Sequence, residues 1–134
     1  MGLSNAGRDF IAAAIIGDDT GTADQALTTF NNANAALGVG DSSTAFAATQ
    51  TDLQAASNKL RKGMESTYPQ RSGNVLTFRA SFADGEAEFA WNEVGVFNSP
   101  DAATGTMLSR SVSSLGTKGA DSVWEITHTL TLTV

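Results

Sequence analysis

The chain has 134 residues, enough for one ordinary domain with its own core, and it contains no cysteine. Disulfide bonds, thiolate nucleophiles and thiolate metal ligands are therefore excluded. The net charge of -6 repels phosphate backbones and anionic lipid, so neither nucleic acid nor a membrane is an expected partner. The longest apolar run, residues 10–16, is too short to span a bilayer.

The N-terminal segment has the pattern of a helix that ends at Gly17. Apolar and small residues recur at spacings of three and four, and Ser4 or Asn5 can cap the first free amides. Residues 17–24 (GDDTGTAD) contain only turn formers and small polar groups, so they predict a mobile loop. Their carboxylates resemble a calcium loop, but the EF-hand spacing and its closing glutamate are missing, so no calcium site is expected.

The next part of the chain is expected to be rich in loops. Alternating residues at 33–39 predict a short strand, and residues 59–64 predict another. Between them, residues 41–58 are dominated by serine, threonine, alanine and glutamine, which predicts a long loop with one helical turn after Thr51. Loops of this length in compact domains often bind ligands or contact other subunits.

Three segments of the second half alternate between apolar and polar residues, as strands do. They cover residues 76–82, 88–97 and 106–112, and residues 115–121 predict a loop. The apolar register slips near Asn92 and Glu93, which predicts a β-bulge there.

Residues 122–134 give the clearest strand pattern of the sequence. One parity is apolar apart from a histidine, and the other is mostly threonine, which fits a pleated, half-exposed surface. The first parity holds Trp124, Ile126, His128, Leu130, Leu132 and Val134, and the second holds Glu125, Thr127, Thr129, Thr131 and Thr133. We expect the first face to close the core and the second to meet solvent or a symmetry mate.

Together these elements predict one α+β domain, mainly β, over residues 1–134. It comprises an N-terminal helix (1–17), a loop-rich part with short strands (18–73) and an antiparallel β core (74–134). The sheet or sandwich is expected to have about five or six strands, mostly antiparallel because the connections in the second half are too short for crossovers.

The sequence offers few residues for catalysis. Its single histidine, His128, could act as a base alone or with Glu93 or Asp121, or as a buried pH sensor, but its apolar parity favours a neutral core or interface side chain. Residues 38–41 (GVGD) begin like a phosphate loop, but Ser43 stands where the third glycine belongs. We therefore assign no catalytic, cofactor-binding or metal-binding residue, and expect neither a cofactor nor an enzyme.

Two groups of residues could serve binding. Lys59, Arg61 and Lys62 could form a contact patch for an acidic neighbouring subunit, or simply a solvated strand edge where lysine discourages unwanted pairing. Three aromatic residues could provide stacking platforms for a carbohydrate, although the core parity of the last favours its burial: Tyr68, Trp91 and Trp124. A carbohydrate-binding or other ligand-binding β-module is therefore an alternative function.

The segment around Glu93 carries a resemblance to a known group of proteins. Residues 92–98 (NEVGVFN) precede a turn, then residues 105–110 (GTMLSR), residues 115–118 (LGTK) and the closing strand WEITHTLTL. This order resembles bacteriophage virion proteins of the tail-fibre and collar type. In those proteins a glutamate, a glycine-containing apolar stretch and a Gly-x-apolar-Leu-x-Arg strand precede a terminal strand. Residues 38–41, with Thr-Asp-Leu further on, are similar to the start of that module, so the likeness covers most of the chain.

This resemblance implies a non-catalytic virion component on the outside of the particle, assembled in the host cytoplasm. Such components are usually oligomeric and often trimeric, and they contact other virion proteins such as capsid or tail subunits. The sequence stops at Val134, at the module's last strand, with no shaft, repeat or receptor-binding tip. We therefore expect a small adaptor, a collar protein or a capsid-decorating (cement) protein.

Overall fold

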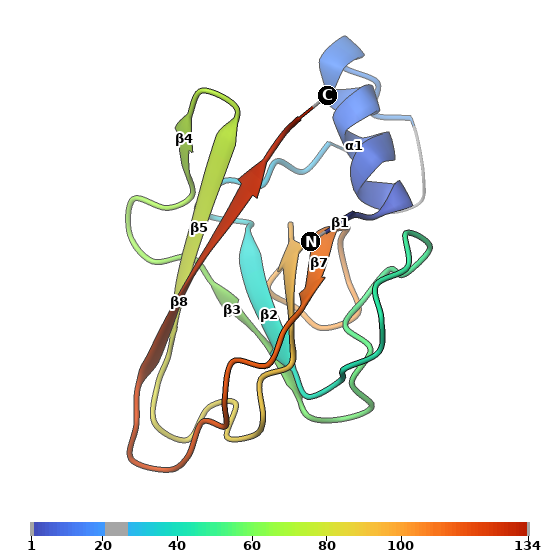
Figure 1. Ribbon diagram of the computed structural model, residues 1–134. Helices are drawn as coiled ribbons and strands as arrows, with labels where there is room; N and C mark the ends of the chain where they lie inside the picture. The colour runs from blue at the N-terminus through green and yellow to red at the C-terminus, as the bar shows by residue number, and fades with distance from the viewer. Residues whose placement is uncertain (1, 21–26, 134) are drawn as a thin grey trace.

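The computed structural model describes residues 2–20 and 27–133, which form two β-sheets packed face to face with one helix beside them (Figure 1). In chain order the elements are β1 (Gly2–Leu3), α1 (Asn5–Ile16), β2 (Ala36–Gly40), β3 (Lys59–Gly63), β4 (Gln70–Ser72), β5 (Val75–Phe82), β6 (Glu93–Phe97), β7 (Met107–Val112) and β8 (Trp124–Thr131). A five-stranded sheet has the order β1-β7-β6-β2-β3, and a three-stranded sheet has the order β4-β5-β8. The strands pair antiparallel throughout these residues, which confirms the predicted α+β, mainly β class.

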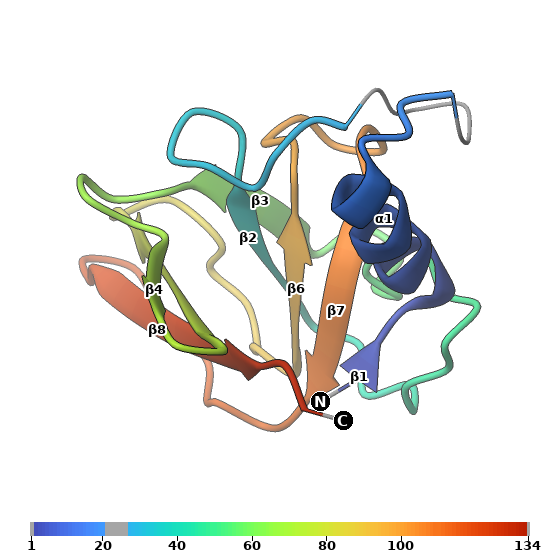
Figure 2. The same cartoon turned by 90° about the horizontal axis from the view of Figure 1, so that it is seen from above.

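Helix α1 is capped at Ser4 and ends at Gly17 as predicted, but Gly2–Leu3, placed by the sequence analysis in the helix 1–17, form strand β1. The Ser4 hydroxyl accepts a hydrogen bond from the Gly7 amide at 2.9 Å, and Gly17 adopts the left-handed conformation, with φ 69°, that ends the helix. The Ser4 hydroxyl also donates to the Met107 carbonyl on β7. Helix α1 lies alongside β7 (Figure 2), so close that a Cβ at Gly7 would overlap the Leu108 carbonyl oxygen.

The main core lies between the two sheets and is not confined to the second half of the chain. Strand β2, from the part predicted to be rich in loops, lies between β6 and β3, and all five of its residues are buried. The two sheets contribute the following buried apolar side chains: Leu37, Val39, Val94, Val96 and Leu108 from one, and Phe78, Ala80, Phe82 and Leu130 from the other. The β core, assigned by the sequence analysis to residues 74–134, thus also includes β2 from the part predicted to be rich in loops.

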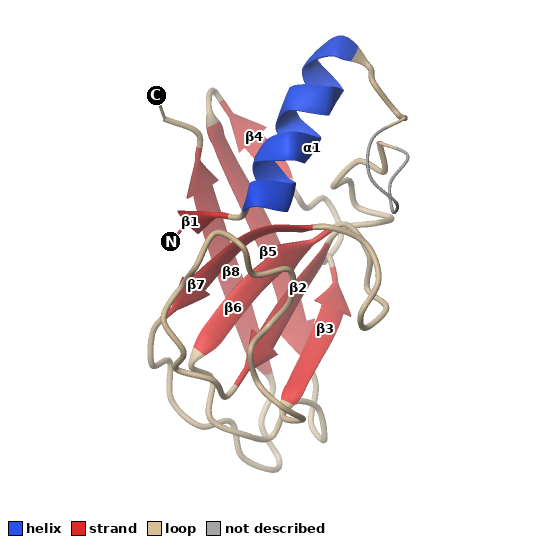
Figure 3. Ribbon diagram, turned by 90° about the vertical axis from the view of Figure 1, so that its right-hand side faces the viewer, coloured by secondary structure: helices blue, strands red, loops and turns tan. Residues whose placement is uncertain are grey.

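Residues 41–58, here named the covering segment, lie over the outer face of the five-stranded sheet, on the side that faces the viewer in Figure 3. Leu53 of this segment packs with Phe97 and Met107 in a second buried cluster. The segment has no regular secondary structure, so the helical turn predicted after Thr51 is wrong. Its cover explains why β2 and β6 are buried on both faces.

Two details of the predicted strands are wrong. Strand β6 begins at Glu93, and residues 88–92 instead form a connection in which Ala90 makes an isolated bridge to Thr117. The irregularity in register lies between Val96 and Phe97, because the pairing to β7 there skips one residue, and not at residues 92–93.

Strand β8 confirms its predicted alternation over the residues that pair with β5. Along Trp124–Thr131 each core-facing residue is buried or half-buried and each residue of the other parity is exposed. Leu132, predicted to face the core, is 37% exposed because it follows the last residue of the strand. Val134, predicted for the same face, lies outside the described residues.

Replacing Gly7 by alanine should destabilise the protein. Alanine favours a helix, but its Cβ would have to displace the Leu108 backbone, so we expect the free energy of unfolding to fall by about 1–3 kcal/mol. Gly63→Ala is a matched control, because a Cβ there meets no atom within 4 Å, and it should change stability by less than about 0.5 kcal/mol. Urea denaturation measures both, and equal stability of the two variants would contradict the close packing of α1 on β7.

Candidate functional site

A buried ion pair lies between the five-stranded sheet and the covering segment. Arg110 Nε donates to Glu93 Oε1 at 2.8 Å, and both side chains are 0% exposed. The two Glu93 oxygens also accept hydrogen bonds from the Gln54 amide at 2.8 Å and the Ala55 amide at 2.9 Å. Arg110 Nη1 donates to the side chain of Gln50 at 3.1 Å. One carboxylate thus joins β6, β7 and the covering segment.

The glycines of β2 make room for this pair. A Cβ at Gly40 would overlap the Glu93 carboxylate, and a Cβ at Gly38 would press on Leu53 and Phe97 at 2.9 Å. The glycines of the GVGD run therefore belong to a buried strand and leave room for the Glu93 carboxylate and the Phe97 ring against the sheet. The run resembles a phosphate loop because this packing requires glycines at positions 38 and 40.

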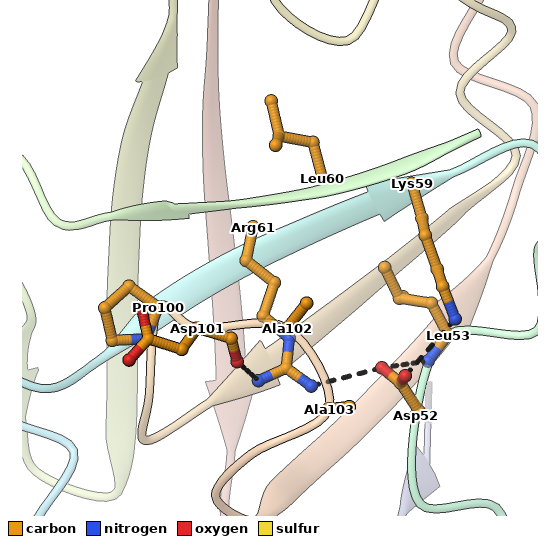
Figure 4. A pocket seen from close by; sticks show the side chains of 9 residues that line it. All are labelled: Asp52, Leu53, Lys59, Leu60, Arg61, Pro100, Asp101, Ala102 and Ala103. Atoms are coloured by element: carbon orange, nitrogen blue, oxygen red, sulfur yellow. Dashed lines mark hydrogen bonds and ion pairs between the residues drawn. The ribbon is translucent and has the colours of Figure 1, made fainter. Parts of the chain in front are cut away.

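A pocket of about 250 Å³ opens beside the edge strand β3 (Figure 4). The covering segment, β3 and the turn after β6 line it with Asp52, Leu53, Lys59, Leu60, Arg61, Pro100, Asp101, Ala102 and Ala103. The Arg61 guanidinium lies 3.6 Å from the Phe97 ring centroid, and its side chain is only 5% exposed. Its Nη1 donates to three carbonyl oxygens of the turn, those of Ser99, Asp101 and Thr104, at 2.7–3.2 Å. Arg61 therefore holds the turn closed against the sheet.

The charges around this pocket neutralise one another. Asp52 pairs with Lys59 Nζ at 3.3 Å and with Arg61 Nη2 at 3.2 Å. Burial raises the pKa of the Asp52 carboxyl, but the Leu53 amide and the two cations lower it more, so the pKa lies below its ordinary value. Lys62 pairs with Glu86 at 2.6 Å. The structure thus places all three residues of the predicted contact patch in internal ion pairs, on a strand that does form a sheet edge.

An apolar groove of about 220 Å³ lies between α1 and the adjoining end of the sandwich. Its lining is almost entirely apolar and comes from the helix, the segment before β2 and both sheets: Phe10, Ile11, Thr29, Phe30, Pro69, Leu76, Phe78, Leu108 and Leu132. Residues four apart lie on one side of a helix, so Ile15 continues the side of α1 that Ile11 turns to the groove. Ile15 is 78% exposed and its neighbour Ile16 is 77% exposed. Ile16, five residues after Ile11, lies on another side of the helix. We name this groove and the two exposed isoleucines in the last turn of α1 the α1 apolar surface.

His128 is not brought together with the carboxylates considered as its catalytic partners. It lies in β8 opposite Phe78, with its side chain on the core-facing parity, whereas Glu93 is on the outer face of the other sheet. Asp121 lies in an exposed turn before β8. Burial lowers the pKa of His128 below its ordinary value, which favours the neutral core histidine that the sequence predicts.

The predicted stacking platforms are partly or fully covered. Trp91 is 2% exposed, and its indole N–H donates to the Ala87 carbonyl at 3.0 Å. The half-buried Trp124 ring packs edge-to-face on Trp91, with ring centroids 5.0 Å apart. Tyr68 lies beneath the Arg79 guanidinium, 4.5 Å from its ring centroid. Trp91 therefore has no ring face to offer to a sugar.

The structure describes only part of the calcium-like segment. Asp18 accepts hydrogen bonds from the amide and the hydroxyl of Thr20, and residues 21–24 of that prediction lie outside the described residues. Across residues 2–20 and 27–133, no group of three or more histidine, aspartate or glutamate side chains could hold a metal ion. Helix α1, the one helix of that range, lacks the length and apolar content to cross a bilayer.

Glu93 and Arg110 stand in two separate short motifs of the sequence, and neither motif carries a local signal that the two side chains form a pair. The sequence gives no pattern that marks Gln50 or the amides of the covering segment as partners of this ion pair, because their hydrogen bonds depend on the conformation of a loop. Comparison with protein-family models and with curated proteins finds no match for this chain.

Glu93→Gln should destabilise the protein strongly. The substitution keeps the shape of the side chain but leaves the Arg110 charge buried without its counter-ion, so we expect a loss of about 3 kcal/mol or more in the free energy of unfolding. Glu86→Gln is the matched control, since it breaks the half-exposed pair with Lys62 and should cost less than about 1 kcal/mol. Chemical denaturation compares the two, and similar losses would contradict the central role of the Glu93 carboxylate.

His128 should make stability depend on pH below neutrality. Because burial holds its folded pKa below the unfolded value of about 6.5, the unfolded chain takes up the proton first as pH falls. Its contribution is fully present above about pH 6.5 and is lost as pH drops toward the folded pKa. We therefore expect the Tm of the natural chain to fall more between pH 7 and 5 than that of His128→Gln. Parallel Tm profiles would refute this, because the chain has no other histidine.

Proposed function

We propose that this chain is a non-enzymatic structural protein of a bacteriophage virion. It would act as an oligomeric surface component, either an adaptor of the tail, collar or fibre attachment or a decoration (cement) protein of the capsid. Its partners would be copies of itself, as a trimer or another homo-oligomer, and other virion proteins such as capsid or tail subunits. The resemblance of residues 92–118 and the closing strand to tail-fibre and collar proteins is the first support for this proposal.

The α1 apolar surface is the observation that carries the proposal. Exposed apolar side chains on a helix that also lines an apolar groove favour binding of another protein there, because burying them is favourable. Ile15 and Ile16 are among the most exposed large apolar residues of the described chain, and Phe10 and Phe30 meet edge-to-face in the groove, with ring centroids 5.0 Å apart. A surface of this kind suits a subunit that is buried in an assembly.

The roles of Glu93 and Arg110 also support a structural protein. Both residues belong to the motifs that carry the resemblance, and both are used to hold the covering segment on the sheet. Residues that a building block shares with similar proteins are expected to maintain its shape, which this pair does. The proposal therefore explains the presence of Glu93 and Arg110 in these motifs without assigning them a role in catalysis.

The double variant Ile15→Asp with Ile16→Asp should lose binding to the particle and keep its fold. Charges at these exposed positions oppose burial in an interface, so we expect co-sedimentation with purified phage particles to fall at least tenfold. Ser57→Asp with Ser114→Asp adds the same charge at exposed polar positions and should associate like the natural chain. A natural chain that stays monomeric and does not bind the particles would disprove the proposal.

A further inference from the structure

Strand β8 has a free edge. Within the described residues it pairs only with β5, through a regular register that runs from Val75 opposite Thr131 to Phe82 opposite Trp124. The Leu132 amide donates to the Asn74 carbonyl, which continues this ladder. Because hydrogen-bonding directions alternate along a strand, the even-numbered residues of β8 face β5. The amides and carbonyls of residues 125, 127, 129 and 131 therefore point away from β5.

The other three sheet edges are protected in recognised ways, and β8 is not. Strand β1 has two residues and β4 has three, so each offers a short edge. Strand β3 has five residues, and the charged side chains of Lys59, Arg61 and Lys62 lie beside it with their partners Asp52 and Glu86. Short edges and edges lined with charged side chains discourage pairing with another chain. Strand β8 has eight residues, with no lysine, no proline and no shift in register.

The side chains of β8 also leave apolar surface uncovered. Trp124 and Ile126 point toward the core but are only half-buried, unlike Leu130. In Figures 1 and 2 β8 forms the margin of its sheet, with β5 on one side of it. A strand added at this margin would extend the sheet and cover these two side chains.

We propose that β8 pairs antiparallel with β8 of a second copy of this chain, about a two-fold axis at His128. In this register Thr127 lies opposite Thr129 of the second copy, and Glu125 lies opposite Thr131. On the core-facing side Ile126 lies opposite Leu130. The residues whose amides and carbonyls point away from β5 thus form the hydrogen-bonded pairs between the two strands. The apolar side chains of the two strands lie on the same side of the joined sheet.

The distribution of charge favours this partner. Two copies with a net charge of -6 each repel one another over most of their surfaces. Strand β8 carries one acidic residue, Glu125, which lies 3.7 Å from Arg79 and opposes a threonine in the proposed register. The β8 edge is therefore a place where two acidic chains can approach without opposing like charges. The inference does not depend on the proposed function, since it uses neither the α1 apolar surface nor a particle.

Single cysteines test the register, because the natural chain has none. His128→Cys would place two cysteines across a pair that is not hydrogen-bonded, with Cα atoms about 4.5 Å apart, which is within the range for a disulfide. We expect mild oxidation to convert this variant to a covalent dimer of twice the monomer mass. Thr131→Cys, which would lie opposite Glu125 and far from its own copy, should form no covalent dimer under the same conditions. A folded His128→Cys variant that forms no more dimer than Thr131→Cys would overturn the proposed register.

Charge exchange tests the pairing without altering the core. Thr127→Lys with Thr129→Lys would oppose lysines across the axis, and Thr127→Glu with Thr129→Glu would oppose glutamates. Each variant alone should sediment as a monomer, whereas an equimolar mixture should sediment at twice the monomer mass. Thr77→Lys, on the same face of the neighbouring strand β5, should associate like the natural chain. A mixture that stays monomeric would refute the β8 pairing, and co-sedimentation of that mixture with phage particles would leave the proposed function standing.

Discussion

The rest of this structure depends on the ion pair and the hydrogen bonds that the Glu93 carboxylate makes. This carboxylate lies on the outer face of the five-stranded sheet, where an isolated buried charge would be costly, and it is compensated by Arg110 and by two backbone amides. Those amides belong to the covering segment, so the loop cannot leave the sheet without exposing the pair or leaving the carboxylate without its donors. A long, polar stretch of chain is thereby held as a third layer of the domain.

This layer explains the unusual composition of the central strands. Strand β2 is buried on both faces, yet one of its faces carries glycines instead of large side chains. The space above Gly38 and Gly40 is taken by Phe97, Leu53 and the Glu93 carboxylate. The guanidinium of Arg61 then lies over Phe97 and binds the turn that follows β6. Two arginines, Arg110 on β7 and Arg61 on β3, thus hold the loops that cover the sheet, one on each side of the central strands β6 and β2.

The same arrangement determines which surfaces remain for partners. The cations of β3 are used within the molecule, in pairs with Asp52 and Glu86, so the chain presents an acidic surface of low charge density. The chain can therefore associate through apolar side chains, as on the α1 apolar surface, or through backbone hydrogen bonds, as at the edge of β8. One supports the proposed assembly on a particle, and the other supports pairing between two copies.

Elements whose signals are local can be predicted from the amino-acid sequence alone. The cap at Ser4, the end of α1 at Gly17 and the alternation of β8 all follow from residues within a few positions of one another. The buried position of β2, the pairing of Glu93 with Arg110 and the ion pairs of the β3 cations depend on how the folded chain packs. Each of these joins residues far apart in the chain. A glycine that leaves room for a carboxylate has the same local pattern as a glycine in a turn, and only the packed fold separates them.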